Sequence, residues 1–169
     1  VSICRVSGNL TDHYDPGKKV VNLSDSVYGS TSVSAVGVAA HECGHVIQHA
    51  RGYVPITIRT ALVPIVNFAS RLSMPLILIG LILGYVGLAK IGVILFCGVL
   101  IFQLVTLPVE FDASARAMRV LDSLGILYGE EIKGARKVLT AAALTYVAAV
   151  VSTALQVFRL VLLINNRRD

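Results

Sequence analysis

The chain has 169 residues, of which 55% are hydrophobic and 15% are charged, and its net charge is +5. About a quarter of the residues of a typical soluble domain are charged, so this composition argues against a soluble protein and for an integral membrane protein. No cluster of lysine and arginine is interleaved with aromatic residues, which excludes the usual pattern of a nucleic-acid-binding protein.

The cysteines bear on disulfide formation, and the first residue bears on where the natural chain begins. Cys4, Cys43 and Cys97 form no Cys-x-x-Cys pair, and one cysteine is left over after any pairing. This argues against a disulfide framework and favours a reducing compartment. The chain begins at Val1 rather than at methionine, so we expect it to lack its natural N-terminus, which leaves the total number of membrane spans open.

Residues 1–31 are the most polar part of the chain and predict a small β-hairpin. The segments 1–6 and 19–23 are rich in β-branched residues, and Asp15, Pro16 and Gly17 supply a turn between them. An isolated hairpin is only marginally stable, so we expect it to pack on the following helix. The strand at 19–23 could also offer an exposed edge to which a substrate strand adds.

Residues 32–53 predict a helix with clear start and stop signals. Ser32 or Ser34 can cap its first turn, Gly52 fits the position just past its end, and Pro55 prevents continuation. This helix carries the candidate chemistry.

The sequence His-Glu-x-x-His lies in the middle of that helix. Because an α-helix has 3.6 residues per turn, His41 and His45 lie on one face, where both imidazoles can bind the same Zn2+. Glu42 lies beside them, placed to remove a proton from a water molecule. The alternative is a charged helix face that binds no metal.

Residues 64–107 predict a transmembrane hairpin. Pro64–Leu88 and Ile91–Leu107 are each near the length of about 20 residues that a span requires, and Lys90 would lie at the tip. The run 76–83 has no polar face, which argues against two buried helices of a soluble core.

Two further helices are predicted after the hairpin. Residues 108–125 form an amphipathic helix, with Pro108 either ending the second span or opening this helix, and Gly125 stopping it. Residues 130–164 form a final transmembrane helix. We therefore expect a single membrane-embedded domain over 1–169. It is a mainly α integral membrane protein with a zincin-like active-site helix, a small N-terminal β-hairpin and about three transmembrane helices.

Glu110 is the predicted third metal ligand. A transmembrane hairpin returns to the side that it left, so Glu110 and the two histidines lie at the same membrane face. Asp112 is the rival, but two residues further along a helix it points about 160° away from Glu110. It therefore suits a supporting acceptor or an ion-pair partner better, and Ser114 could hydrogen-bond a ligand histidine. The alternative for Glu110 is an acid that only favours the helix dipole.

The remaining polar candidates have weaker assignments. His49 lies one turn beyond His45 and suits a packed or supporting histidine better than a ligand. Cys43 points away from the metal face. Groups that could contact substrate or stabilise an oxyanion are His13, Tyr14, Tyr53 and Arg116, and Arg116 is equally an ion-pair partner for Asp112 or Glu110.

Motifs that carry a family resemblance are spread over nearly the whole chain. They are Leu10–Pro16, Leu23–Ser24, Val38–His45, Gln48–His49, Gly52–Tyr53, Glu110–Ser114, Leu121–Gly125 and Ala142–Ala148. On these motifs the chain resembles the YugP-type neutral zinc metallopeptidases of bacterial membranes. Its architecture is also similar to that of the HtpX-like membrane zinc peptidases, in which a transmembrane hairpin separates His-Glu-x-x-His from a Glu-x-x-Ala-Asp helix.

The resemblance implies a gluzincin-like zinc endopeptidase that binds one zinc ion per chain. It implies that His41, His45 and Glu110 are the ligands and that Glu42 is the general base. Ser114 stands where the HtpX-like proteins have an acidic residue, so the supporting role of that acidic residue does not transfer.

We therefore predict a multi-pass protein of the cell membrane that hydrolyses a protein or peptide substrate at the membrane surface. The alternative is a catalytically silent scaffold or quality-control partner, against which the intact Glu42 argues. A metal transporter would need ligands within the spans, where no histidine lies. The basic residues favour a cytoplasmic active site. Those on the site-bearing side are Arg51, Arg59, Arg116, Arg119, Lys133, Arg136 and Lys137, against Lys90, Arg167 and Arg168 on the other side.

Overall fold

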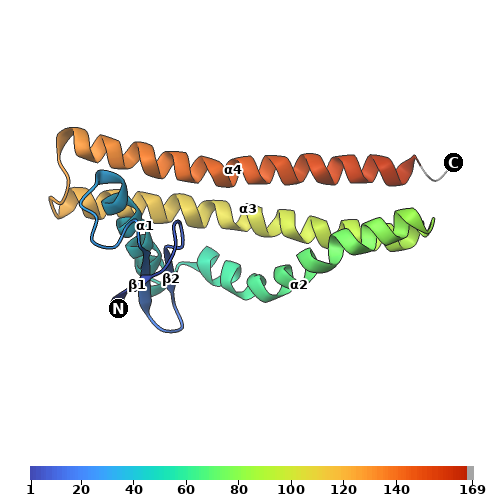
Figure 1. Ribbon diagram of the computed structural model, residues 1–169, viewed down its shortest axis with the longest axis horizontal. Coiled ribbons are helices and arrows are strands. Elements are labelled where there is room, and N and C mark those ends of the chain that lie inside the picture. Colours follow the sequence, from blue (N-terminus) through green and yellow to red (C-terminus); the bar gives the residue numbers. More distant parts are fainter. Residues whose placement is uncertain (167–169) are drawn as a thin grey trace. The chain divides into compact units, whose positions relative to one another are not determined.

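A computed structural model describes residues 1–166 and contains three short strands followed by four helices (Figure 1). The chain is mostly helical, and three of its helices are long and apolar enough to cross a membrane. The predicted fold class is therefore confirmed. Arg167 and Arg168, which the charge argument placed on the far side of the membrane, lie outside the described residues.

The N-terminal strands form one sheet, in the order β1-β3-β2. β1 (Ser2–Val6) pairs in parallel with β3 (Val20–Ser24), and β2 (His13–Asp15) pairs antiparallel with β3. The hairpin predicted between the first and last of these strands is therefore wrong. The hairpin joins β2 to β3 instead, because the Asp15 side chain accepts hydrogen bonds from the backbone N–H groups of Gly17 and Lys18 and closes the turn there.

The central place of β3 also corrects the prediction of an exposed edge at 19–23. β3 is hydrogen-bonded on both sides, and Val21 and Leu23 are buried. Its last residue, Ser24, is hydrogen-bonded to Asp12. The Asp12 carboxylate accepts one hydrogen bond from the Ser24 N–H and one from the Ser24 hydroxyl. A substrate strand therefore cannot add to β3.

α1 spans Val33–Ala50 and ends as the sequence predicted. Ser32 is the N-cap, and its hydroxyl accepts a hydrogen bond from the Ala35 N–H. At the other end the chain turns at Gly52 with a φ of 62°, a conformation that glycine adopts without strain.

The three long helices are α2 (Val54–Ile82), α3 (Val86–Ser123) and α4 (Gly129–Asn165). The turn between α2 and α3 lies at 83–85, earlier than predicted, and Lys90 lies within α3 rather than at the tip. Gly84 ends α2 there because its φ of 74° breaks the helical repeat.

Two prolines that were placed at or near helix ends lie inside helices. Pro64 lies within α2, and Pro108 lies within α3, so 108–123 is the continuation of the second predicted span rather than a separate helix. A proline in a helix interior removes one backbone hydrogen bond. α3 continues past Pro108, and the next residue, Val109, is completely buried.

The chain forms two compact units. The first comprises Val1–Thr57 and Pro108–Thr145, and the second comprises Ile58–Leu107 and the chain from Tyr146 onward. The core of the first unit contains small residues, Ala40, Ala117 and Ala135, beside Leu121 and Leu139. The expectation of a single membrane-embedded domain stays a prediction.

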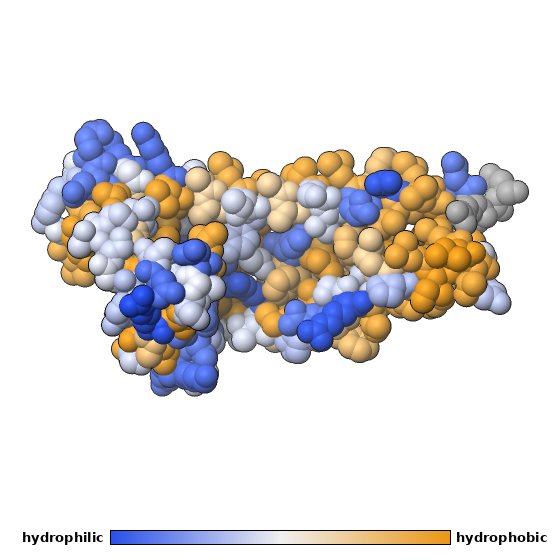
Figure 2. All heavy atoms as spheres, in the orientation of Figure 1, coloured by the Kyte–Doolittle hydropathy of each residue, from blue (hydrophilic) through white to orange (hydrophobic). Residues whose placement is uncertain are grey.

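The second unit has a small core and an apolar exterior. Its core contains Ile77, Ala89, Val93, Leu160 and Ile164. Many large apolar side chains of its helices are exposed, and Figure 2 shows them covering much of the visible face of the long helices. An exterior of this kind suits lipid rather than water.

Candidate metal centre

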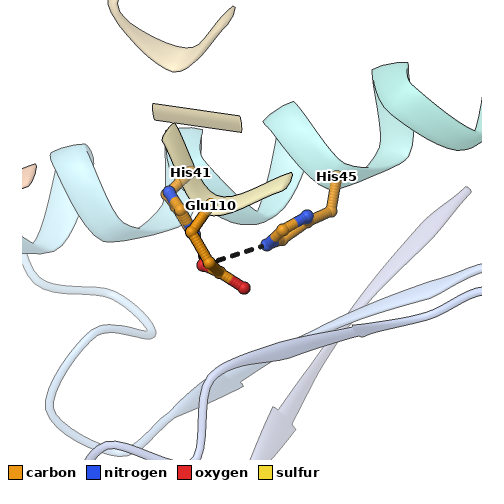
Figure 3. A group of neighbouring side chains, drawn as sticks. All are labelled: His41, His45 and Glu110. Carbon is orange, nitrogen blue, oxygen red and sulfur yellow. Dashed lines mark hydrogen bonds and ion pairs between the residues drawn. The ribbon is translucent and has the colours of Figure 1, made fainter. Parts of the chain in front are cut away.

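Three potential metal ligands meet in the first unit. His41 and His45 leave the same side of α1, one turn apart, and Glu110 approaches them from α3 (Figure 3). One ligand atom from each residue lies within 4.8 Å of the other two. Glu110 Oε2 is 3.2 Å from His41 Nε2 and 3.8 Å from His45 Nε2. The topological argument that selected Glu110 from the sequence therefore selected a residue that does reach both imidazoles.

The donor set fits a zinc ion. Two imidazole nitrogens and one carboxylate oxygen are the ligands of one common class of catalytic zinc site, in which a fourth position stays open for water or substrate. Glu110 is 2% exposed and His45 is 8% exposed. The two imidazoles lie against this buried carboxylate, and a divalent cation could be bound by the same three side chains.

The close approach of α1 and α3 depends on two small residues. A Cβ atom added to Gly44 would lie only 2.4 Å from the Ala113 carbonyl oxygen, which is far inside van der Waals contact. Ala113 itself is completely buried. Gly44 therefore lets the backbone of α3 pass close to the histidine pair. Gly44 could not be distinguished from other glycines by sequence, because close approach depends on the partner helix.

Each histidine has a partner on its other ring nitrogen. His41 Nδ1 lies 3.1 Å from Ser114 Oγ, the contact that the sequence had suggested for a ligand histidine. His45 Nδ1 lies 2.9 Å from Gln48 Oε1. Sequence reasoning assigned no role to Gln48, although its position one turn after His45 on the same helix was a usable signal.

Comparison with known proteins fits this geometry. Residues 1–165 match the family described as "Putative neutral zinc metallopeptidase". The chain belongs to this zinc metallopeptidase family. It is 48% identical over 164 residues to "Putative membrane protease YugP" of Bacillus subtilis (strain 168), which covers 97% of this chain and 73% of that protein. No solved structure matches the chain.

In this member of the zinc metallopeptidase family, Glu42 lies buried close to the three potential ligands. Burial raises the pKa of its carboxyl, the charges of His45 and His41 lower it, and the charge of Glu110 raises it again, with a raised pKa as the result. For His45, burial acts to lower the pKa, but hydrogen bonding to Glu110 and its charge outweigh burial and raise it. Carboxylates and imidazoles coupled in this way bind protons or a metal ion in competition.

Asp112 lies outside the three-ligand group. Its carboxylate accepts hydrogen bonds from the Gln48 side chain at 2.9 Å and from Arg116, with which it forms an ion pair. The Arg116 guanidinium lies over the Tyr53 ring, 5.5 Å from its centre. Asp112 and Arg116 thus adopt the ion-pair alternative that the sequence left open.

The other candidate residues have contacts of their own. His13 Nδ1 lies 2.8 Å from the Thr11 carbonyl oxygen, and its Nε2 lies 3.2 Å from the Asn22 side chain. His49 packs against the Tyr14 ring with their centres 5.5 Å apart. Within residues 1–166, neither histidine joins the potential metal ligands. Cys43 has a pKa raised by burial, and no disulfide links the three cysteines.

Proposed function

We propose that this protein is a membrane-bound zinc endopeptidase in which His41, His45 and Glu110 bind one zinc ion and Glu42 is the general base. The observation that carries the proposal is the meeting of three ligand atoms within 4.8 Å, with a buried Glu42 beside them. Membership of the zinc metallopeptidase family and the relationship to a protein named as a membrane protease support the same chemistry.

Two roles are needed for peptide hydrolysis at this site: His41, His45 and Glu110 bind the metal ion, and Glu42 transfers the proton. A bound zinc ion supplies a Lewis acid that lowers the pKa of a water molecule to about 7. The Glu42 carboxylate takes the proton released by the attacking water and then gives it to the nitrogen of the leaving amine. The low exposure of Glu42 suits this transfer, because a buried carboxylate with a raised pKa accepts a proton more readily.

Among the candidates for oxyanion stabilisation, Arg116 already binds other side chains. Its guanidinium is bound to the Asp112 carboxylate and covers the Tyr53 ring. We therefore assign Arg116 and Tyr53 to the support of the site and keep His13, which lies on the β2 strand, as the candidate for contact with substrate.

We further propose that the active site faces the cytoplasm. Basic residues follow α1 at Arg51 and gather in the C-terminal part of α3 and at the start of α4, including Arg119 and Lys133. Basic residues next to membrane spans favour the cytoplasmic side. The substrate would then be a protein or peptide at the inner membrane surface.

Metal analysis and proteolysis of the purified protein test the proposal. We expect about one zinc per chain, as for a site with three protein ligands, and cleavage of an unfolded polypeptide substrate. Glu42→Gln should abolish cleavage and keep the zinc, whereas Glu131→Gln, the same change at an exposed helix start, should change neither. Loss of zinc in Glu42→Gln would make Glu42 a ligand. Stoichiometric zinc with no cleavage by the wild-type protein would favour the silent scaffold.

A further inference from the structure

Gln48 is a completely buried polar side chain at the centre of a hydrogen-bond network. It lies on α1 one turn after His45 and is 0% exposed. Its Oε1 lies 2.9 Å from His45 Nδ1, and its Nε2 donates to the Val109 carbonyl oxygen at 2.7 Å and to Asp112 Oδ2 at 2.9 Å. The amide group thus uses its oxygen and both of its N–H groups.

The acceptors on α3 fix the orientation of the Gln48 amide. A backbone carbonyl and an ionised carboxylate can only accept hydrogen bonds, so both must face the amide NH2 group. The amide oxygen therefore faces His45, and an oxygen of this kind can only accept. In the neutral ring, His45 Nδ1 must therefore carry the proton, and the lone pair is on Nε2, the nitrogen that lies 3.8 Å from Glu110 Oε2 and that would bind the metal ion.

Asp112 and Arg116 hold the far end of this network. The carboxylate oxygen that accepts from Gln48 is also the one that accepts from Arg116 Nε. This ion pair keeps Asp112 charged and directed at Gln48. The second acceptor, the Val109 carbonyl, belongs to the residue before Glu110, so Gln48 also binds α1 to the segment of α3 that carries the carboxylate ligand.

His41 has a different partner at Nδ1, and its Nε2 lies 3.2 Å from Glu110 Oε2. Its Nδ1 lies beside the Ser114 hydroxyl, which can donate or accept, so that contact alone does not select a tautomer. The two histidines therefore differ in whether the partner of Nδ1 determines the tautomer: an amide oxygen does so for His45, and a hydroxyl does not for His41.

We propose that Gln48 is a positioning residue that fixes the neutral His45 ring as its Nδ1–H tautomer and leaves the Nε2 lone pair for the metal ion, with Asp112 setting the direction of the Gln48 amide. The consequence for metal binding rests on the proposed zinc site, but the tautomer itself does not. Groups that orient a ligand histidine typically change metal affinity by about 10–100-fold when they are removed.

The tautomer can be read directly in metal-free protein. Long-range 1H–15N NMR of chelator-treated, 15N-histidine-labelled protein in nanodiscs, at a pH where the ring is neutral, reports which nitrogen is protonated, with His45→Gln supplying the assignment. We expect a single Nδ1–H form for wild type and a mixture for Gln48→Leu. An Nε2–H form in the wild-type protein would overturn the proposal.

Zinc affinity, measured by competition with a chromophoric chelator, is the second readout. We expect Gln48→Leu to bind zinc about 10–100-fold more weakly than wild type, while the matched control Gln156→Leu on α4 stays unchanged. Equal affinity of Gln48→Leu and wild type would overturn the role in metal binding. A wild-type protein that binds no zinc would refute the proposed function, and the NMR result would still decide the tautomer.

A pair of substitutions that exchanges the donor and acceptor groups of Gln48 and Asp112 distinguishes a positioning role of Gln48 from a general packing defect. In Gln48→Glu the carboxylate can still accept from Nδ1–H but faces the negative charge of Asp112, so zinc affinity should fall. Adding Asp112→Asn removes that charge and supplies an N–H donor, so the double variant should recover part of the affinity and keep the Nδ1–H form. Failure of Asp112→Asn to improve on Gln48→Glu alone would contradict the network, even if Gln48→Leu does not fold.

Discussion

The two parts of α3 differ in which side chains are exposed and which are buried. In Val86–Leu107 the exposed side chains are large and apolar, such as Ile94 at 69% and Ile101 at 58% exposure. In the part from Pro108 to Ser123, Glu110 is buried, and Asp112 and Arg116 are paired beside it. One uninterrupted helix thus presents apolar groups outward in one part and holds Glu110, Asp112 and Arg116 inward in the other.

This difference follows from what each part can contact. Lipid provides no partner for a charge, so an exposed position in a span must be apolar. A buried charge is stable only with partners, and the second part of α3 has them in His41, His45, Gln48 and Arg116. The contrast predicts that one kind of substitution has different effects in the two parts.

The largest expected effect is the loss of the metal from the Glu110→Ala variant. The change removes one of the three proposed ligands and leaves two imidazoles, so we expect zinc content to fall well below one per chain. Glu131→Ala, at an exposed position of α4, is the matched control. Mass spectrometry of the purified proteins measures the zinc, and unchanged zinc in Glu110→Ala would give the third position to another residue.

A charge placed in the apolar part of α3 should have the next largest effect. Ile94→Arg puts a cation near the middle of the span at a position with 69% exposure, and such a charge costs about 2.5–3.5 kcal/mol of insertion free energy. Leu124→Arg, just past the end of α3 and 70% exposed, should cost less than about 0.5 kcal/mol. A membrane-integration assay compares the two. Equal costs would show that 86–107 does not lie in lipid.

A smaller effect is expected when a glycine that faces the second part of α3 is replaced by alanine. This glycine is Gly44 on α1. Gly44→Ala would force the backbones of α1 and α3 apart at Ala113, and overpacking of this kind costs about 1–3 kcal/mol. Since the shift also moves Glu110 from the histidines, zinc should bind more weakly.

Gly98→Ala is the control for this change. No atom lies within 4 Å of a Cβ added at Gly98, which is in the apolar part of α3, so thermal stability should hold or rise through better helix propensity. If Gly44→Ala kept wild-type stability and zinc affinity, the close approach of the two helices would not be required.

The smallest expected effect is that of Ser114→Ala. It removes the hydroxyl beside His41 Nδ1, and a single neutral hydrogen bond contributes about 0.5–1.5 kcal/mol. Zinc affinity should therefore fall less than in Gln48→Leu, by chelator competition. A larger loss in Ser114→Ala than in Gln48→Leu would reverse our ranking of the two histidine supports.

Local signals predicted much of this fold. The cap at Ser32, the stop at Gly52 and the placement of His41 and His45 on one helix face depend on neighbouring residues alone, and each was correct. Glu110 could be selected because a helical hairpin constrains topology.

The features that failed depend on partners distant in the sequence. The parallel pairing of β1 with β3 could not be read from strand composition, since the same residues suit either direction. The passage of α3 through Pro108 and the close contact at Gly44 depend on the facing helix. Gln48 was missed because a glutamine on a helix is usually exposed, and only its burial reveals the network.

X-ray absorption at the zinc edge of the purified wild-type protein tests the central claim most directly. We predict a zinc ion with two imidazole nitrogens at about 2.0–2.1 Å, oxygen ligands at about 2.0–2.2 Å and no sulfur. A zinc–sulfur distance of about 2.3 Å would place Cys43 or another cysteine at the metal. That result, or a spectrum with a single imidazole, would contradict a centre built from His41, His45 and Glu110.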